Sequence, residues 1–201
     1  MSSEPTPHVL VLAAGAASRF GSPKQLARLQ GQTLLQRAVA LGTAISGQAV
    51  TVVLGAHAAD IAPSLRGHAA GVVVNRRWKE GLASSLRAGV AQLPGSTPGV
   101  LVLLAYQVAV TDFDLRRLVS TWRQQPDYIV AASYAGHSGV PAIFPAHCFT
   151  ALLELRGDMG ARALLHRMAD RVVRVPMPGA AVDVDTTEDL QRLQQTPSPP
   201  A

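Results

Sequence analysis

The sequence predicts an α/β protein with one largely parallel sheet. Short apolar runs rich in valine and leucine alternate along the chain with longer segments in which apolar residues recur at helical spacing. This alternation is typical of consecutive βαβ units, whose strands run parallel. A chain of 201 residues that is 48% hydrophobic and 15% charged is long enough to bury a substantial core. We therefore expect one domain over residues 8–195, with proline-containing ends at 1–7 and 196–201 that are disordered.

Strands are predicted where valine, leucine and alanine cluster between turn-forming residues. Near-continuous apolar runs are expected for parallel strands because helices cover both faces of such a sheet. The predicted strands are residues 8–13, 49–55, 71–75, 100–105, 128–133, 140–144, 172–175 and 181–184.

Helices are predicted between these strands. Residues 33–46 give the clearest pattern, with Leu34 and Leu41 among the apolar residues of one face. The last helix begins near Thr187, directly after a Thr186–Asp189 pair with capping-box spacing, so Thr186 is as well explained by a cap as by a functional role. The other predicted helices are residues 58–65, 81–93, 112–124, 147–155 and 160–169.

The loop after the first strand, LAAGAASRFGSPKQL at 12–26, favours a triphosphate site. Small residues let backbone N–H groups approach a ligand closely, and a guanidinium and an ammonium supply positive charge. Neither GxGxxG nor GxxxxGK[ST] fits this segment, and an ordinary turn with exposed charges is the structural alternative. Only two of the 18 basic residues are lysines, and one of them is in this loop. The binding residues expected here are Leu12, Ala13, Ala14, Gly15, Arg19 and Lys24.

The charge distribution argues against a nucleic-acid partner. The net charge is +5 and the pI is near 10.1, but the arginines are scattered and aromatic residues make up only 4%. A single-strand platform would need basic residues interleaved with aromatic ones. Small anionic ligands explain the composition better.

The sequence also argues against a membrane span, an internal disulfide and a zinc site. The apolar run at 100–110 is much shorter than the roughly 20 residues of a membrane helix. The start, MSSEPTPH, lacks a signal-peptide pattern, which predicts a cytoplasmic protein. Cys148 is the single cysteine, and no Cys/His cluster has zinc-site spacing.

Four further segments complete a recognisable pattern with the first loop: VVVNRRWKEGLASSLRAGV at 72–90, LVLLAYQVAVT at 101–111, HSGVPAIF at 137–144, and LRGDMGARALL followed by VDVDTTEDL. Over roughly residues 8–195 the chain resembles the molybdenum-cofactor nucleotidyltransferases, and LAAG followed by RFG resembles the cytidylyltransferase branch. The resemblance implies a three-layer α/β/α Rossmann-like fold with a mostly parallel mixed sheet. It also implies CTP and Mg²⁺ as ligands, and transfer of CMP to the terminal phosphate of a molybdopterin-type cofactor with release of pyrophosphate.

The same resemblance assigns roles to individual residues. Arg19 and Lys24 match the catalytic, triphosphate-binding pair, and Asp185 matches a metal-binding aspartate, with Asp183 as the alternative. Plainer roles stay open: a strand end or a helix start for the nucleotide-site residues, a helix N-cap for Asp158 and packing for Trp78. The residues that match the segment lining the nucleotide site are Asn75, Gly81, Ser84 and Ser85.

Two site motifs depart from the family pattern. Residues 104–108 read LAYQV where the family has LADQP, so Tyr106 stands in place of a metal-binding aspartate. A phenol is neutral at pH 7 and a poor ligand for Mg²⁺, which predicts weakened metal binding. Val140 replaces the histidine of the GHP segment, and Asp112 and Asp114 are expected to cap the next helix.

Two hypotheses follow. In the first, the protein is a nucleotidyltransferase whose Mg²⁺ is held mainly by the triphosphate and Asp185. In the second, it is a catalytically weakened relative that binds a nucleotide or a molybdopterin and hands the cofactor to a molybdoenzyme. Both require small-molecule partners, with neither nucleic acid nor membrane involved.

Overall fold

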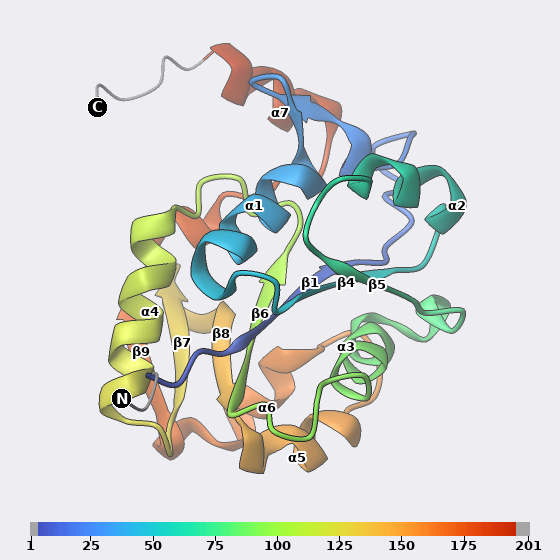
Figure 1. Ribbon diagram of the computed structural model, residues 1–201. Coiled ribbons are helices and arrows are strands. Elements are labelled where there is room, and N and C mark those ends of the chain that lie inside the picture. The colour runs from blue at the N-terminus through green and yellow to red at the C-terminus, as the bar shows by residue number, and fades with distance from the viewer. Residues whose placement is uncertain (1–3, 196–201) are drawn as a thin grey trace.

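A computed structural model describes residues 4–195 and contains a seven-stranded sheet in the order β5-β4-β1-β6-β8-β7-β9 (Figure 1). Strand β8 runs antiparallel to both of its neighbours, and the other strand pairs of this sheet are parallel. The sheet is therefore mixed and mostly parallel, as predicted. Its strands are β1 (His8–Ala13), β4 (Val50–Leu54), β5 (Gly71–Val74), β6 (Gly99–Leu104), β7 (Ile129–Tyr134), β8 (His137–Pro145) and β9 (Val172–Pro176).

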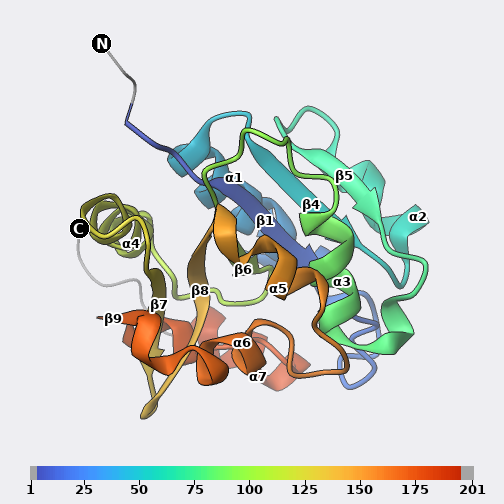
Figure 2. The same ribbon diagram turned by 90° about the horizontal axis from the view of Figure 1, so that it is seen from below.

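Helices cover both faces of the sheet, which confirms the three-layer fold (Figures 1 and 2). One apolar core lies under α1, α2 and α4, and a second lies under α3, α5 and α6. Alternate residues of β1 point into the two cores, Val9 and Val11 into the first and Leu10 and Leu12 into the second. The helices are α1 (Leu34–Ser46), α2 (Ala58–Ile61), α3 (Leu82–Val90), α4 (Asp112–Gln124), α5 (Phe149–Leu153), α6 (Ala161–Arg167) and α7 (Thr187–Gln195).

A smaller unit lies beside the carboxyl end of β1. The short strands β2 (Arg28–Leu29) and β3 (Gln32–Thr33) form a hairpin that the sequence analysis did not predict. Phe20 from the loop after β1, Val184 and residues of α7 pack with this hairpin in a third apolar cluster. The chain segment before α7 is thereby held beside the loop after β1 (Figure 1).

Two predicted elements differ in the structure. Residues 181–184 do not form a strand: a 3-10 turn, Pro178–Ala181, precedes a single antiparallel bridge between Asp183 and Gln107. The Gln107 side chain donates to the carbonyl of Ala180 and the backbone N–H of Val184 donates to the carbonyl of Tyr106, which holds this segment against the loop after β6. The helix predicted at 58–65 becomes 3-10 after Ile61, because Pro63 has no N–H group to continue it.

The predicted cap of α7 is confirmed, whereas of the two aspartates expected to cap α4 only Asp114 does so, because the Asp112 carboxylate pairs with Arg116. Thr111 and Asp114 form a capping box, in which the Asp114 carboxylate accepts from the backbone N–H of Thr111. Thr186 and Asp189 form the equivalent box before α7. The Asp114 and Asp189 carboxylates are thus used in helix starts.

Candidate functional site

A cavity of about 310 Å³ opens at the carboxyl ends of β1 and β6. This end of a doubly wound sheet is where ligands bind in such folds. The cavity is lined by residues 12–16, by Lys24 and Gln25, by residues around the start of α3, and by residues 104–106. The loop after β1 and the start of α3 thus form two walls of one pocket.

The loop after β1 presents free backbone donors. Within residues 4–195, the N–H groups of residues 14–19 donate to no backbone or side-chain acceptor. Ala17 has a φ of 53°, a conformation that residues other than glycine rarely adopt and that is common where function requires strain. Successive free N–H groups form an anion-binding concavity. The loop can therefore bind phosphate oxygens without side chains.

Lys24 and Arg19 meet at one carboxylate. The Lys24 ammonium lies 2.8 Å from Asp185 Oδ1 and donates to the carbonyl of Val184 at 3.0 Å, and Arg19 Nη2 lies 3.0 Å from Asp185 Oδ2. The hydrogen bond from Lys24, with the charges of Lys24 and Arg19, lowers the pKa of Asp185. Both oxygens of this carboxylate are thus engaged with cations. Lys24 is largely buried, whereas Arg19 is exposed and lies outside the cavity lining.

Tyr106 lies beneath Lys24. The ammonium is 3.6 Å from the centroid of the phenol ring, a cation–π contact. Burial, followed by the negative charges of Asp183 and Asp185, raises the pKa of Tyr106 above its usual value. The phenol is therefore neutral across the physiological range. It holds Lys24 through its ring and offers no charge to a metal ion.

Asp183 is the second carboxylate at this end. Although the residue as a whole is exposed, protein atoms displace water from the carboxylate, and this together with Asp185 raises its pKa to about 6. Its oxygens accept no hydrogen bond from the part of the chain that the structure describes. A cation would relieve the repulsion between the two aspartates.

A divalent cation fits this pair of carboxylates. No group of three or more His, Cys, Asp or Glu side chains with metal-binding geometry occurs among residues 4–195. The protein can thus supply Asp185 and Asp183 but no complete coordination shell. Mg²⁺ is ordinarily held by one or two carboxylates together with substrate phosphates and water, which matches this donor set.

Stability should respond to Asp183 in a pH-dependent way. Because the pKa of Asp183 rises from 3.8 to about 6 on folding, the folded state loses stability as pH rises through that interval. Asp183→Asn should therefore raise the melting temperature at about pH 8, and the gain should shrink toward zero near pH 4. Asp127→Asn, an exposed site, is the control. An equal gain at both pH values would contradict this explanation.

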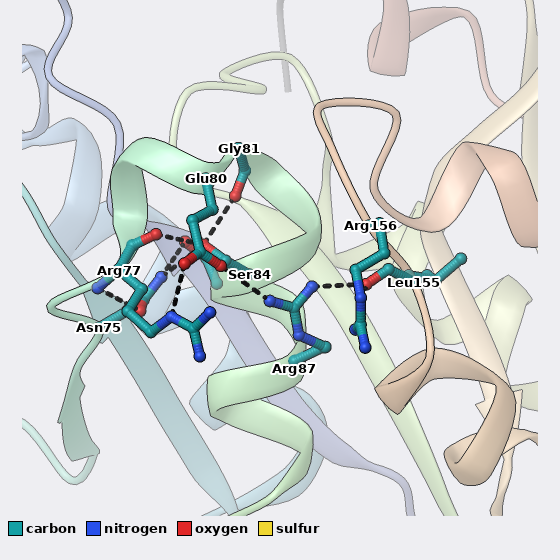
Figure 3. Close-up of polar contacts among 9 residues, drawn as sticks. Asn75, Arg77, Glu80, Gly81, Ser84, Arg87, Leu155 and Arg156 are labelled. Carbon is teal, nitrogen blue, oxygen red and sulfur yellow. Dashed lines mark hydrogen bonds and ion pairs between the residues drawn. The ribbon is translucent and has the colours of Figure 1, made fainter.

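The second wall is supported by a buried polar cluster (Figure 3). The Asn75 side chain donates to the hydroxyls of Ser84 at 2.8 Å and Ser85 at 3.1 Å, and it accepts from the backbone N–H of Arg77. The backbone N–H of Asn75 continues the β4–β5 ladder by donating to Leu54. Of the residues expected at the nucleotide, Gly81 and Ser85 line the cavity, while Asn75 and Ser84 lie behind it.

An ion-pair network fixes the start of α3 to the segment before α6 (Figure 3). Glu80 pairs with Arg77 and Arg87, and Arg87 also donates to the carbonyl of Leu155. Asp158 follows in that segment and lies against Gly81 at the edge of the cavity. The prediction that Asp158 caps the next helix is wrong, because Gly160 occupies the N-cap position of α6.

Two features of this wall require a glycine at position 81. It has a φ of 95°, and a Cβ there would lie 2.6 Å from the carbonyl oxygen of Gly157 and would collide with Asp158. Gly81→Ala should destabilise the protein by about 2 kcal/mol or more in urea unfolding and should weaken nucleotide binding. Gly95→Ala, at a site with open space and no left-handed backbone, should be nearly neutral. Equal stability of the two variants would contradict the close packing described here.

The cavity residues that were not predicted as binding residues include Gln25, Trp78, Lys79 and Asp158. Lysine scarcity was a usable signal, because both lysines of the chain line the same cavity. Trp78 both packs against the α3-side core and faces the cavity. No sequence pattern marked Gln25.

The comparisons with known proteins agree with this fold. Residues 9–172 match the family model of the MobA-like NTP transferase domain. A curated relative, nicotine blue oxidoreductase of Paenarthrobacter nicotinovorans, is 30% identical over 92% of this chain and 94% of its own length. The crystal structure of Rv0371c from Mycobacterium tuberculosis H37Rv superposes with a TM-score of 0.84 at 29% identity, covering 96% of this chain and all of that one.

A second structure bears on the metal. Rv0371c from the same organism in complex with manganese superposes with a TM-score of 0.75 at 27% identity, again over 96% of this chain and 100% of the other.

No helix in the described part of the chain has the length and apolarity that crossing a bilayer requires.

Proposed function

Because the chain belongs to the MobA-like NTP transferase family, we propose that it transfers a nucleotidyl group, specifically CMP from CTP to the terminal phosphate of a molybdopterin-type cofactor. The single observation that carries this proposal is the loop after β1. Its free N–H groups at 14–19 stand beside Lys24 and Arg19 at one end of a cavity of nucleotide size.

The proposed reaction is an in-line displacement at phosphorus. A terminal phosphate oxygen of the acceptor attacks the α-phosphorus of CTP, the bond from that phosphorus to the bridging oxygen of the β-phosphate breaks, and pyrophosphate leaves. The loop N–H groups bind the β- and γ-phosphates. Lys24 and Arg19 neutralise the charge that develops on the leaving pyrophosphate, which is the main contribution a protein makes to such a step.

For this reaction, the Lys24 ammonium must exchange some of its present contacts for contacts with the phosphates. In the structure its ammonium contacts Asp185, the carbonyl of Val184 and the ring of Tyr106. Incoming phosphates offer stronger acceptors than the carbonyl and the ring. We propose that Lys24 turns toward the phosphates, which frees one oxygen of Asp185.

Asp185 and Asp183 are the residues that would hold a divalent cation. When bound, Mg²⁺ would neutralise part of the charge on the phosphates. The manganese complex of Rv0371c, a relative of the same fold, supports binding of a divalent ion by this chain. Tyr106 leaves the protein with fewer charged ligands than the family pattern, so we propose that affinity for the free ion is weak.

CTP is favoured by the loop sequence. LAAG followed by RFG at 12–21 resembles the cytidylyltransferase branch, in which Ala14 replaces the second glycine of the guanylyltransferase loop. Gly81 and Ser85 stand on the opposite wall, held by Asn75 and Ser84, where small polar groups can contact a pyrimidine.

A second candidate is supported by Tyr106. A neutral phenol at this position, together with the engagement of both Asp185 oxygens, suits a protein that binds a nucleotide or a molybdopterin and delivers the cofactor to a molybdoenzyme. A relative of nearly the same length is named an oxidoreductase, so family membership alone leaves the reaction open. The retained Lys24, Arg19 and Asp185 favour the transferase.

The deciding assay is pyrophosphate release with CTP, GTP or ATP, in the presence of Mg²⁺ or Mn²⁺ and a molybdopterin acceptor. The transferase predicts release with CTP that is lost in Asp185→Ala. Release no greater than that of Asp185→Ala with every nucleotide would exclude the transferase. Calorimetric titration that shows binding of neither CTP nor the cofactor would exclude the carrier as well.

A further inference from the structure

Gln25 is a buried side chain that hydrogen-bonds to the end of β1 and to the loop that follows it. It is 4% exposed, and its amide nitrogen donates to the carbonyls of Ala13 at 2.8 Å and Gly15 at 2.9 Å. The orientation of the amide is fixed by these partners, because a carbonyl oxygen accepts hydrogen bonds and cannot donate them. One side chain therefore joins two carbonyls that are two residues apart.

Together with the pairing of Ala13 in β1, these two bonds set where the following N–H groups point. A peptide unit is planar and trans, so the C=O of one residue and the N–H of the next point in opposite directions. Holding the carbonyls of Ala13 and Gly15 toward Gln25 turns the N–H groups of Ala14 and Ala16 away from it. Both of these residues line the cavity, and both N–H groups lack an acceptor in the described structure.

The arrangement has a cost in stability. Gln25 Oε1 is buried and has no hydrogen-bond partner among residues 4–195. A buried acceptor without a partner lowers the stability of the folded state. An uncompensated polar atom in a ligand pocket is typical of residues kept for function and not for stability.

Gln25 directly follows Lys24, the residue that supplies the ammonium group of the site. Lys24 and Gln25 are adjacent in the 3-10 turn Lys24–Leu26, with Lys24 on Asp185 and Gln25 on the loop. The same turn thus places the ammonium and fixes the backbone donors opposite it.

We infer that Gln25 is the positioning residue of the phosphate-binding loop: its amide clamps the carbonyls of Ala13 and Gly15 so that the N–H groups of Ala14 and Ala16 face the polyphosphate. This inference rests on the proposed function. It predicts that Gln25 contributes to binding in proportion to the number of phosphates bound, and that its contribution does not depend on the nucleobase.

The test is calorimetric titration of CMP, CDP and CTP, without divalent cations, into wild type and Gln25→Met. The methionine keeps the volume of glutamine and removes both donors. Affinity for CTP should fall about tenfold, and affinity for CMP by about twofold or less. Gln107→Met is the matched control, because Gln107 is also buried and also donates to two backbone carbonyls, those of Val140 and Ala180. It should show no dependence on phosphate number.

The results of this titration distinguish a failure of the role inferred for Gln25 from a failure of the proposed function. Unchanged CTP affinity in Gln25→Met, or equal losses for CMP, CDP and CTP, would overturn the role of Gln25 while the function stood. Wild type that binds no CTP would overturn both. A second measurement needs no variant: adding inorganic triphosphate to the ¹⁵N-labelled wild type should shift the amide resonances of Ala14 and Ala16. If neither resonance moves, the inference is wrong.

Discussion

Lys24→Met should reduce nucleotidyl transfer about 100- to 1,000-fold, the usual effect of removing a preorganised charge from a transition state. Lys24 is the most enclosed cation of the site, in contact with Asp185, the carbonyl of Val184 and the Tyr106 ring. Methionine keeps most of the aliphatic stem and removes the ammonium. The kcat for pyrophosphate release should fall by most of this factor, because charge on the leaving pyrophosphate is greatest in the transition state.

Arg66→Met is a suitable control for Lys24→Met. It removes one positive charge from an exposed site outside the cavity lining. Its rate should stay within about twofold of wild type, since exposed charges beyond a Debye length are screened. Comparable losses in the two variants would mean that overall charge, and not a contact with the nucleotide, accounts for the effect.

Tyr106→Asp should raise the rate about 10- to 100-fold at saturating metal and should tighten Mg²⁺ binding at the same time. The substitution would place a third carboxylate beside Asp183 and Asp185, where the phenol is neutral and cannot compensate metal charge. Titration of the rate with Mg²⁺ and with Mn²⁺ gives both quantities from one experiment.

Tyr106→Phe is the matched control for Tyr106→Asp. The ring that contacts Lys24 is retained and only the neutral hydroxyl is lost. Rate and metal dependence should stay within about twofold of wild type, because no charged ligand is gained. An unchanged rate in Tyr106→Asp would contradict the idea that the phenol limits catalysis and would implicate Val108 and Val140, the other departures from the family pattern.

The fold was predictable from the sequence where local and long-range signals agree. Strand β1, helix α4 and the capping box at Thr186 have the predicted positions, because an apolar run or a cap motif determines each one locally. Residues 181–184 were predicted wrongly. Their short apolar pattern fits a strand, but the segment pairs with the loop after β6 at Asp183 alone.

The site was predictable only in part. Glycine, arginine and lysine spacing identified the loop after β1, and the structure brings Lys24 and Arg19 to the predicted aspartate, Asp185. Spacing cannot distinguish a side chain in a cavity wall from one behind it, so Asn75 and Ser84 could not be separated from Ser85. Gln25 lies within the predicted loop, but its bonds to the backbone carbonyls of Ala13 and Gly15 follow from no sequence motif, and Asp158 meets Gly81 from a distant segment.

A crystal structure with CTP and Mn²⁺ tests the central claim most directly. The account predicts phosphate oxygens on the N–H groups of residues 14–16, Lys24 in contact with phosphate, and the cation between Asp185 and the triphosphate. A nucleotide bound elsewhere, or bound here with its phosphates away from the loop after β1 and Lys24 still on Asp185, would contradict it.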